Sequence, residues 1–156
     1  MSAQLTSFGA APRKRVLVID DNTDDLLLLQ LAARRTSAPI EFSIVRDGRA
    51  AIEHFQKHRR EVSNREALLP DLVLLDLRLP KRDGFEVLRW IRETPGLRAL
   101  KVFIWTGSEN PADRELAKKL GVDLFLSKST DERPLVELIS GIAQWAADGS
   151  PCCQLA

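Results

Sequence analysis

The chain has 156 residues, of which 44% are hydrophobic, and a formal net charge of +1. This length suits one domain with a folded core, and the basic residues are scattered in pairs, which argues against a nucleic-acid-binding protein. No apolar run reaches the roughly 18 residues needed to span a bilayer, and the N-terminus lacks an apolar signal core. We therefore expect a cytoplasmic protein with no nucleic-acid and no membrane partner.

Strands and helices are predicted to alternate along the chain. Residues 1–14 have no hydrophobic periodicity and are expected to form a flexible N-terminal arm. The apolar run 16–19 predicts a strand, and Thr23 is placed to cap a helix that extends to Arg35. The remaining predicted elements are strands at 40–45, 72–75, 101–105 and 122–127, and helices that begin near 49, 85, 111 and 135. Five strands alternating with five helices predict a doubly wound α/β fold around a parallel sheet.

Four of the predicted strands lead directly into polar side chains. Asp20 and Asp21 follow the first strand, Asp76 follows the third, Thr106 ends the fourth, and Lys128 follows the fifth. Because the carboxyl ends of parallel strands meet at one edge of a sheet, these groups are expected to converge. Crowded carboxylates repel unless a cation neutralises them. The pattern therefore predicts a divalent-metal site that handles a phosphoryl group, with one Asp as the acceptor.

Each of these residues also has a simpler interpretation. The Asp20-Asp21 pair could be a polar cap after a strand, Asp76 a turn residue, Thr106 a strand end, and Lys128 a surface lysine. Taken singly, each simpler interpretation competes with the functional one. The coincidence of all of them at predicted strand ends favours the shared site.

The histidines and cysteines give weaker signals. His54 and His58 lie four residues apart on a predicted helix, but no third ligand is near in the sequence, so a solvated helix surface is favoured over a metal site. Cys152 and Cys153 are adjacent and close to the C-terminus, where they are poorly placed to cross-link a domain. The last four residues formally match the prenylation pattern, although the polar Gln154 fits it poorly.

Four segments carry a resemblance to a known family. They read VLVIDDN, LVLLDLRLPKRDGFEVL, FIWTGSE and VDLFLSKS. Over about residues 15–147 the chain resembles the receiver domain of two-component response regulators, and the spacings from Asp76 to Thr106 and from Thr106 to Lys128 match the family pattern. The resemblance implies a flavodoxin-like fold with strand order 2-1-3-4-5, and it leaves residues 148–156 as a C-terminal tail.

The resemblance also implies roles for the converging residues. Asp76 would accept the phosphoryl group as an acyl phosphate, one of the covalent modes known for aspartate. The implied cofactor is Mg²⁺, which prefers oxygen ligands. Asp21 would bind it directly, Asp20 through a water molecule, and Asp76 and the backbone carbonyl of Arg78 would complete the protein ligands. Lys128 would pair with the phosphoryl oxygens.

A switch is implied at Thr106 and Phe125, the family's switch positions. The Thr106 hydroxyl would donate a hydrogen bond once phosphate is present. The chain departs from the family pattern at Ser129, where proline with a cis peptide bond is usual. A cis bond before a residue other than proline costs about 3 kcal/mol, so the geometry of the Lys128–Ser129 peptide stays open. Gly107 stands where alanine is common and leaves room for a phosphoryl group.

A narrower resemblance concerns the partner protein. The long connection 59–69, the LPKRDG turn and Trp145 are similar to stand-alone regulators paired with phytochrome-type photoreceptor histidine kinases. This resemblance implies a signalling protein rather than an enzyme, which relays a signal from a sensor histidine kinase by phosphorylation-dependent binding. A homodimer through the fourth helix, fifth strand and fifth helix is a further expectation, with Val136 and Ala143 lying off the core stripe of the last helix.

Two other functions remain open at this stage. A phosphohydrolase of the haloacid dehalogenase type also uses an aspartate nucleophile and Mg²⁺. Such an enzyme needs a second aspartate two residues later as its acid/base, and this chain has Arg78 at that position. A receiver-like module that binds partners without phosphorylation is the other alternative. The complete acidic set and Lys128 argue against it.

Overall fold

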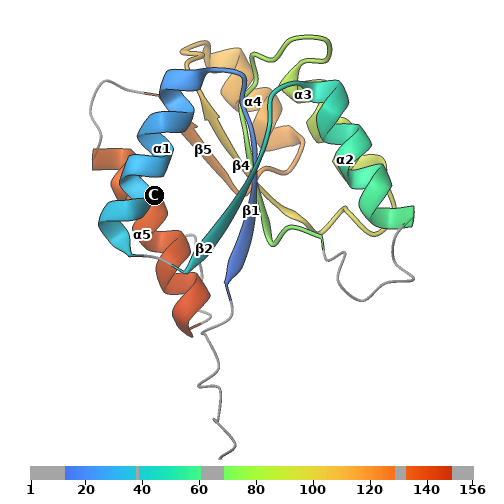
Figure 1. Cartoon of the computed structure of the whole chain (residues 1–156). Coiled ribbons are helices and arrows are strands. Elements are labelled where there is room, and N and C mark those ends of the chain that lie inside the picture. The colour runs from blue at the N-terminus through green and yellow to red at the C-terminus, as the bar shows by residue number, and fades with distance from the viewer. Residues whose placement is uncertain (1–12, 38, 61–68, 129–132, 149–156) are drawn as a thin grey trace, which may run out of the picture.

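The computed structural model describes residues 13–37, 39–60, 69–128 and 133–148. Within these ranges five strands alternate with five helices, as the sequence predicts (Figure 1). The elements are β1 Lys14–Ile19, α1 Thr23–Thr36, β2 Ile40–Val45, α2 Gly48–Arg60, β3 Leu72–Leu75, α3 Gly84–Glu93, β4 Lys101–Thr106, α4 Pro111–Lys119, β5 Leu124–Ser127 and α5 Arg133–Asp148.

All neighbouring strands pair in parallel, and their order in the sheet is β2-β1-β3-β4-β5. The predicted fold class and strand order are therefore confirmed. The register aligns Ile19 with Leu75 and Leu75 with Ile104, so the residues after β1 and β3 emerge at the same level of the sheet. β4 continues to Thr106, which is paired with Ser127. The carboxyl ends of all five strands form the upper edge of the sheet in Figure 1.

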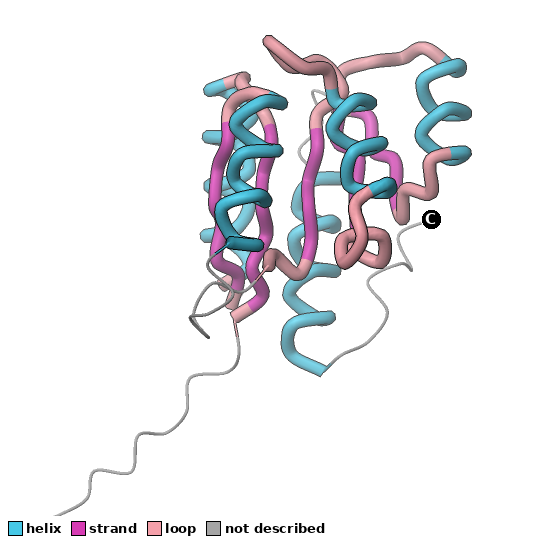
Figure 2. Tube along the Cα trace, turned by 90° about the vertical axis from the view of Figure 1, so that its right-hand side faces the viewer, coloured by secondary structure: helices cyan, strands magenta, loops and turns pink. Residues whose placement is uncertain are grey.

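Helices cover both faces of the sheet (Figures 1 and 2). α1 and α5 pack on one face, where Leu29 and Ile139 join the strand residues Val18 and Leu74 in one buried cluster. α2, α3 and α4 pack on the other face. β3 is buried along its whole length, as expected for a central parallel strand that is covered on both sides. None of the helices in the described part of the chain is long and apolar enough to cross a membrane.

Several element ends differ from the sequence prediction. α1 is capped by Asn22 rather than Thr23, because the Asn22 side-chain carbonyl accepts hydrogen bonds from the N–H groups of Asp24 (2.9 Å) and Asp25 (3.2 Å). β5 begins at Leu124 rather than at residue 122. The Asp123 carboxylate accepts the Val102 N–H at 2.9 Å, so this residue joins β4 through its side chain before the strand starts.

Two surface expectations are also revised. Val136 is half-buried and packs against the core between the sheet and helices α1 and α5. It therefore borders the buried face of α5, although its spacing in the sequence places it on the exposed face. His54 and His58 are half-buried rather than fully solvated, and they line a cavity of about 210 Å³. Burial lowers the pKa of His54, and electrostatic interaction with His58 and Lys57 lowers it further.

Some predictions fall outside the described residues. These are the arm up to residue 12, most of the 59–69 connection, the Lys128–Ser129 peptide, the tail after residue 148, and Cys152 and Cys153.

The loop between β3 and α3 is held by close backbone packing. A Cβ atom on Gly84 would lie 2.3 Å from the Asp76 carbonyl oxygen and 2.6 Å from the Leu77 Cα. The Gly84 N–H donates to the Leu77 carbonyl at 2.9 Å, and Asp83 caps α3 through a reciprocal capping box with Glu86. The start of α3 is therefore pressed against the end of β3, which fixes the backbone that carries Asp76.

We expect Gly84→Ala to destabilise the protein, because the added methyl group meets backbone atoms that cannot move away. The expected loss is about 2 kcal/mol or more in the free energy of unfolding, measured by urea denaturation. Gly107→Ala is the matched control, since its Cβ would meet nothing within 4 Å. Equal stability of the two variants would contradict this account of the loop.

Candidate functional site

The end of β1 presents two aspartates in different environments. Asp20 is 1% exposed, and its Oδ1 accepts the Asn22 N–H at 2.9 Å. Its own N–H donates to the Val45 carbonyl at 3.0 Å, which ties it to the end of β2. Asp21 is exposed. The short turn from β1 into α1 thus places one carboxylate inside the sheet edge and the other at its surface.

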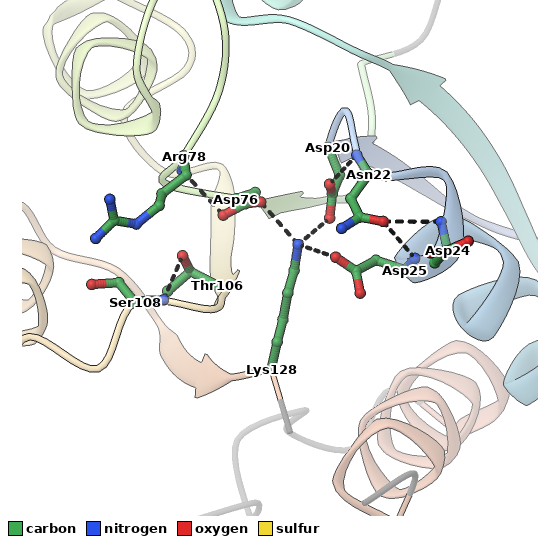
Figure 3. A network of polar contacts seen from close by, with 9 residues as sticks. All are labelled: Asp20, Asn22, Asp24, Asp25, Asp76, Arg78, Thr106, Ser108 and Lys128. Carbon is green, nitrogen blue, oxygen red and sulfur yellow. Dashed lines mark hydrogen bonds and ion pairs between the residues drawn. The ribbon is translucent and has the colours of Figure 1, made fainter. Parts of the chain in front are cut away.

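Asp76 follows β3 in the centre of the same edge. Its side chain is buried, and its N–H donates to the Ile19 carbonyl at 2.9 Å, so its position is set by the β1–β3 pairing. The Oδ1 atom accepts the Arg78 N–H at 3.1 Å. The side chain of Arg78 is exposed and points away from the carboxylates (Figure 3).

Lys128 reaches this centre from the end of β5. Its N–H donates to the Thr106 carbonyl at 2.7 Å, which extends the β4–β5 pairing by one residue. Its ammonium group donates to Asp20 at 2.7 Å, to Asp25 at 2.7 Å and to Asp76 at 2.8 Å (Figure 3). One cation therefore connects acids from β1, α1 and β3.

Burial and charge pairing act in opposite directions on these groups. Burial alone would lower the pKa of the Lys128 ammonium, but the hydrogen bonds that it donates to Asp20, Asp25 and Asp76 outweigh burial and raise that pKa. Burial raises the pKa of the Asp20 carboxyl, and the Lys128 hydrogen bond compensates only in part. Lys128 is consequently stabilised in its charged form, whereas desolvation destabilises the ionised form of Asp20.

The acidic residues fit a hard divalent cation. Asp20, Asp21 and Asp76 each offer one oxygen, and these atoms lie within 4.8 Å of one another. In the described ranges they are the one group of three or more such side chains close enough to share a metal ion, and His54 and His58 belong to no such group. An all-oxygen carboxylate set is the donor chemistry that Mg²⁺ prefers.

Thr106 and the loop after it form the neighbouring wall. Thr106 is fully buried, and its hydroxyl oxygen accepts the Ser108 N–H at 3.3 Å. The buried Ser108 hydroxyl donates to the Asp113 carboxylate on α4. An open groove of about 430 Å³ runs from the loop after Asp76 to the start of α4. The groove is lined by Leu77 and Arg78, the residues that follow Asp76.

Phe125 on β5 lies further from the acidic group. Its ring is half-buried, packs against the core on the α2/α3/α4 face, and carries the Arg114 guanidinium 4.7 Å above its centroid. A groove of about 420 Å³ lies beside it between α4 and β5. The structure therefore brings Asp20, Asp21, Asp76 and Lys128 together, with Thr106 beside them, and leaves Phe125 on an adjoining surface.

Sequence reasoning missed two residues of this arrangement. It assigned Asp25 only to the first turn of a helix, where negative charge is favoured by the helix dipole. It did not single out Ser108. A signal for Asp25 was present, because a helix that follows a parallel strand after a short turn begins at the same sheet edge as the strand's end.

Comparison with known proteins agrees with this geometry. Residues 16–140 match the response regulator receiver domain. The chain belongs to this family. It is 36% identical over 131 residues to the response regulator Rcp1 of Synechocystis sp., with 84% of this chain and 87% of Rcp1 covered. It is 34% identical over 130 residues to the probable methanogenesis regulatory protein FilR2 of Methanothrix harundinacea, with 83% and 81% covered.

Solved response regulator structures are similar to this chain over most of its length. The Mn²⁺-bound form of Rcp1 matches with a TM-score of 0.74 and 32% identity, over 88% of this chain and 97% of Rcp1. The phosphorylated cyanobacterial phytochrome response regulator RcpA matches with a TM-score of 0.72 and 33% identity, over 90% of this chain and 98% of RcpA. The receiver fold and the family are thus established for this chain.

The buried Asp20 carboxylate should lower the stability of the fold when it is ionised. In a buffer with a metal chelator at neutral pH, Asp20→Asn should raise the free energy of unfolding by about 1 kcal/mol, because it removes a desolvated charge while Lys128 keeps Asp25 and Asp76 as partners. The folded state raises the pKa of Asp20, so wild-type stability should approach that of the variant as the pH falls through that pKa. Thermal unfolding across the pH range measures both effects.

Asp21→Asn is the control for this experiment, because Asp21 carries the same charge at an exposed position. It should change the stability in chelator less than Asp20→Asn does. An Asp20→Asn variant that is less stable than wild type in chelator would show that the Lys128 pairing outweighs the cost of burying Asp20.

Proposed function

We propose that the chain is a response regulator that accepts a phosphoryl group on Asp76 from a partner histidine kinase. The observation that carries this proposal is the geometry around Asp76, where a buried carboxylate is paired with Lys128 at 2.8 Å beside two further carboxylates. Membership of the receiver family and the similarity to phosphorylated RcpA support the same function.

The proposed reaction is a phosphoryl transfer between side chains. A carboxylate oxygen of Asp76 attacks the phosphorus atom of a phosphohistidine, a P–O bond forms as the P–N bond breaks, and the electron pair leaves with the imidazole nitrogen. Such a transfer depends mainly on positioning and on neutralising charge. Lys128 donates to the phosphoryl oxygens, which it can reach because its ammonium already contacts Asp76.

Mg²⁺ is the proposed cofactor, and it would neutralise charge between Asp76 and the incoming phosphoryl group. Asp21 would bind it directly, Asp20 would hold it through a water molecule, and Asp76 and the Arg78 carbonyl would complete the protein ligands. The exposed position of Asp21 and the burial of Asp20 support this division of roles. The Mn²⁺-bound form of the relative Rcp1 supports a divalent cation.

The proposed output is a change at the α4–β5 surface. Thr106 turns its hydroxyl to donate to the phosphoryl group, and the vacated space beside β4 becomes available to Phe125. The Lys128 N–H donates to the Thr106 carbonyl, and this hydrogen bond couples the acidic site to β4 and β5, the strands that carry Thr106 and Phe125. A ligand that favours one of two arrangements shifts the population toward it, and the phosphoryl group is that ligand here.

We further propose a phytochrome-type photoreceptor kinase as the partner. The support is the similarity to RcpA and the 29% identity to the bacteriophytochrome response regulator RtBRR, which matches with a TM-score of 0.65. The structure moves both predicted bounds of the receiver domain outward by one residue, because Lys14 belongs to β1 and Asp148 to α5. In this proposal the protein acts in the cytoplasm as a phosphoacceptor rather than as an enzyme.

Phosphorylation provides the test of the proposed acceptor. Incubation with acetyl phosphate and Mg²⁺ should add one phosphoryl group to the wild-type protein, and Asp76→Asn should abolish the addition because it removes the nucleophilic oxygen. Intact-mass spectrometry measures the adduct. An adduct that persists in Asp76→Asn would contradict the assignment of Asp76.

A homodimer through α4, β5 and α5 is the proposed binding event. The groove beside Phe125, lined on one side by Arg114 and Lys118, supports this surface as a docking site. Beryllofluoride, which mimics a phosphoryl group, should shift sedimentation toward a dimer, and Phe125→Ala should reduce the shift. A protein that remains monomeric with and without beryllofluoride at high concentration would exclude the dimer.

A further inference from the structure

Lys128 has a third acidic partner that lies outside the acidic metal-ligand group. Asp25, in the first turn of α1, contacts the ammonium at 2.7 Å with a side chain that is 18% exposed. In Figure 3 its carboxylate approaches the ammonium from the α1 side, whereas Asp76 approaches from the β3 side. The Asn22 cap holds this turn in place by accepting the Asp25 N–H at 3.2 Å.

The other two partners of Lys128 have a conflicting role. Asp20 and Asp76 pair with the ammonium, and both also belong to the group of carboxylates that can share a metal ion. An ammonium and a divalent cation are both attracted to these carboxylates and repel each other, so each weakens the binding of the other there. Asp25 does not belong to the group of possible metal ligands, so its carboxylate stays available to Lys128 when a cation binds that group.

We propose that Asp25 is a positioning residue that keeps Lys128 at the site when a divalent cation draws the carboxylates of Asp20 and Asp76 away from the ammonium. The inference rests on the proposed function, because it concerns the same cation site. By holding the ammonium on the α1 side, Asp25 lowers the cost of cation binding. It also keeps Lys128 within reach of Asp76, the proposed acceptor.

The chain contains a matched control for this role. Asp24 is the preceding residue in the same turn and carries the same charge, but it is exposed, and the described acids that pair with Lys128 are Asp20, Asp25 and Asp76. Replacing either Asp24 or Asp25 with asparagine removes one negative charge near the site and retains the side-chain shape. A difference between the two variants therefore reports the contact with Lys128.

The test is a Mg²⁺ titration by calorimetry. Asp25→Asn should weaken Mg²⁺ binding about five- to tenfold, because Lys128 then stays on Asp20 and Asp76, whereas Asp24→Asn should weaken it less than about twofold. The same two substitutions are then made together with Lys128→Met. In that background their effects should be small and alike, since no ammonium remains to be positioned.

Trp105 gives a readout that does not need the metal. The Lys128 ammonium lies 5.0 Å from the centroid of the Trp105 ring, so its displacement should change the fluorescence of that ring. In chelator, with Trp90→Phe and Trp145→Phe as the background, Asp25→Asn should shift the Trp105 emission and Asp24→Asn should leave it unchanged.

Two outcomes would overturn the inference alone. One is equal Mg²⁺ affinity in Asp24→Asn and Asp25→Asn, and the other is a loss in Asp25→Asn that persists in full with Lys128→Met, which would mean that Asp25 acts on the cation by its own charge. Absence of Mg²⁺ binding in the wild-type protein would instead overturn the proposed metal site and the inference with it.

Discussion

The arrangement of the carboxyl edge depends on one ammonium group. Lys128 directly follows the last strand of the sheet and pairs with acids at the ends of β1 and β3 and in the first turn of α1, at distances of 2.7 to 2.8 Å. Without that charge, buried carboxylates on neighbouring strands would repel one another in a region with little water. The backbone N–H of Lys128 donates to the Thr106 carbonyl, and its ammonium contacts Asp76, so one residue links the edge of the sheet at β4 and β5 to the end of β3.

This centre is an unfavourable way to stabilise a fold. Burial raises the pKa of Asp20, which means that the ionised carboxylate is less stable in the folded protein than in water. An apolar edge would be more stable, but it would lack the carboxylates that the proposed cation binding and phosphoryl transfer require. Proteins commonly accept such a local loss of stability where function needs concentrated charge. The surrounding apolar core, buried on both faces of β3, is what makes the loss tolerable.

Much of the fold could be predicted because each signal is local. The uninterrupted apolar run of β3, the Asn110-Pro111 start of α4 and the polar residues after each strand depend on neighbours in the chain, and the structure confirms them. Errors arose where two residues compete for one role. Asn22 and Thr23 can both cap a helix, and which of them does so is decided by which side-chain oxygen reaches the free N–H groups of the first turn.

The sequence by itself determined the fold class, the order of the elements and the edge at which Asp20, Asp21, Asp76, Thr106 and Lys128 meet, because parallel strands bring their carboxyl ends together whatever the details of packing. Only the tertiary structure decided which acids Lys128 contacts. The choice of Asp25 over Asp24 depends on the rotation of α1 about its axis, and that rotation is set by the packing of Leu26 and Leu29 against the sheet. Contacts between residues far apart in the chain depend on such rotations, which no local pattern specifies.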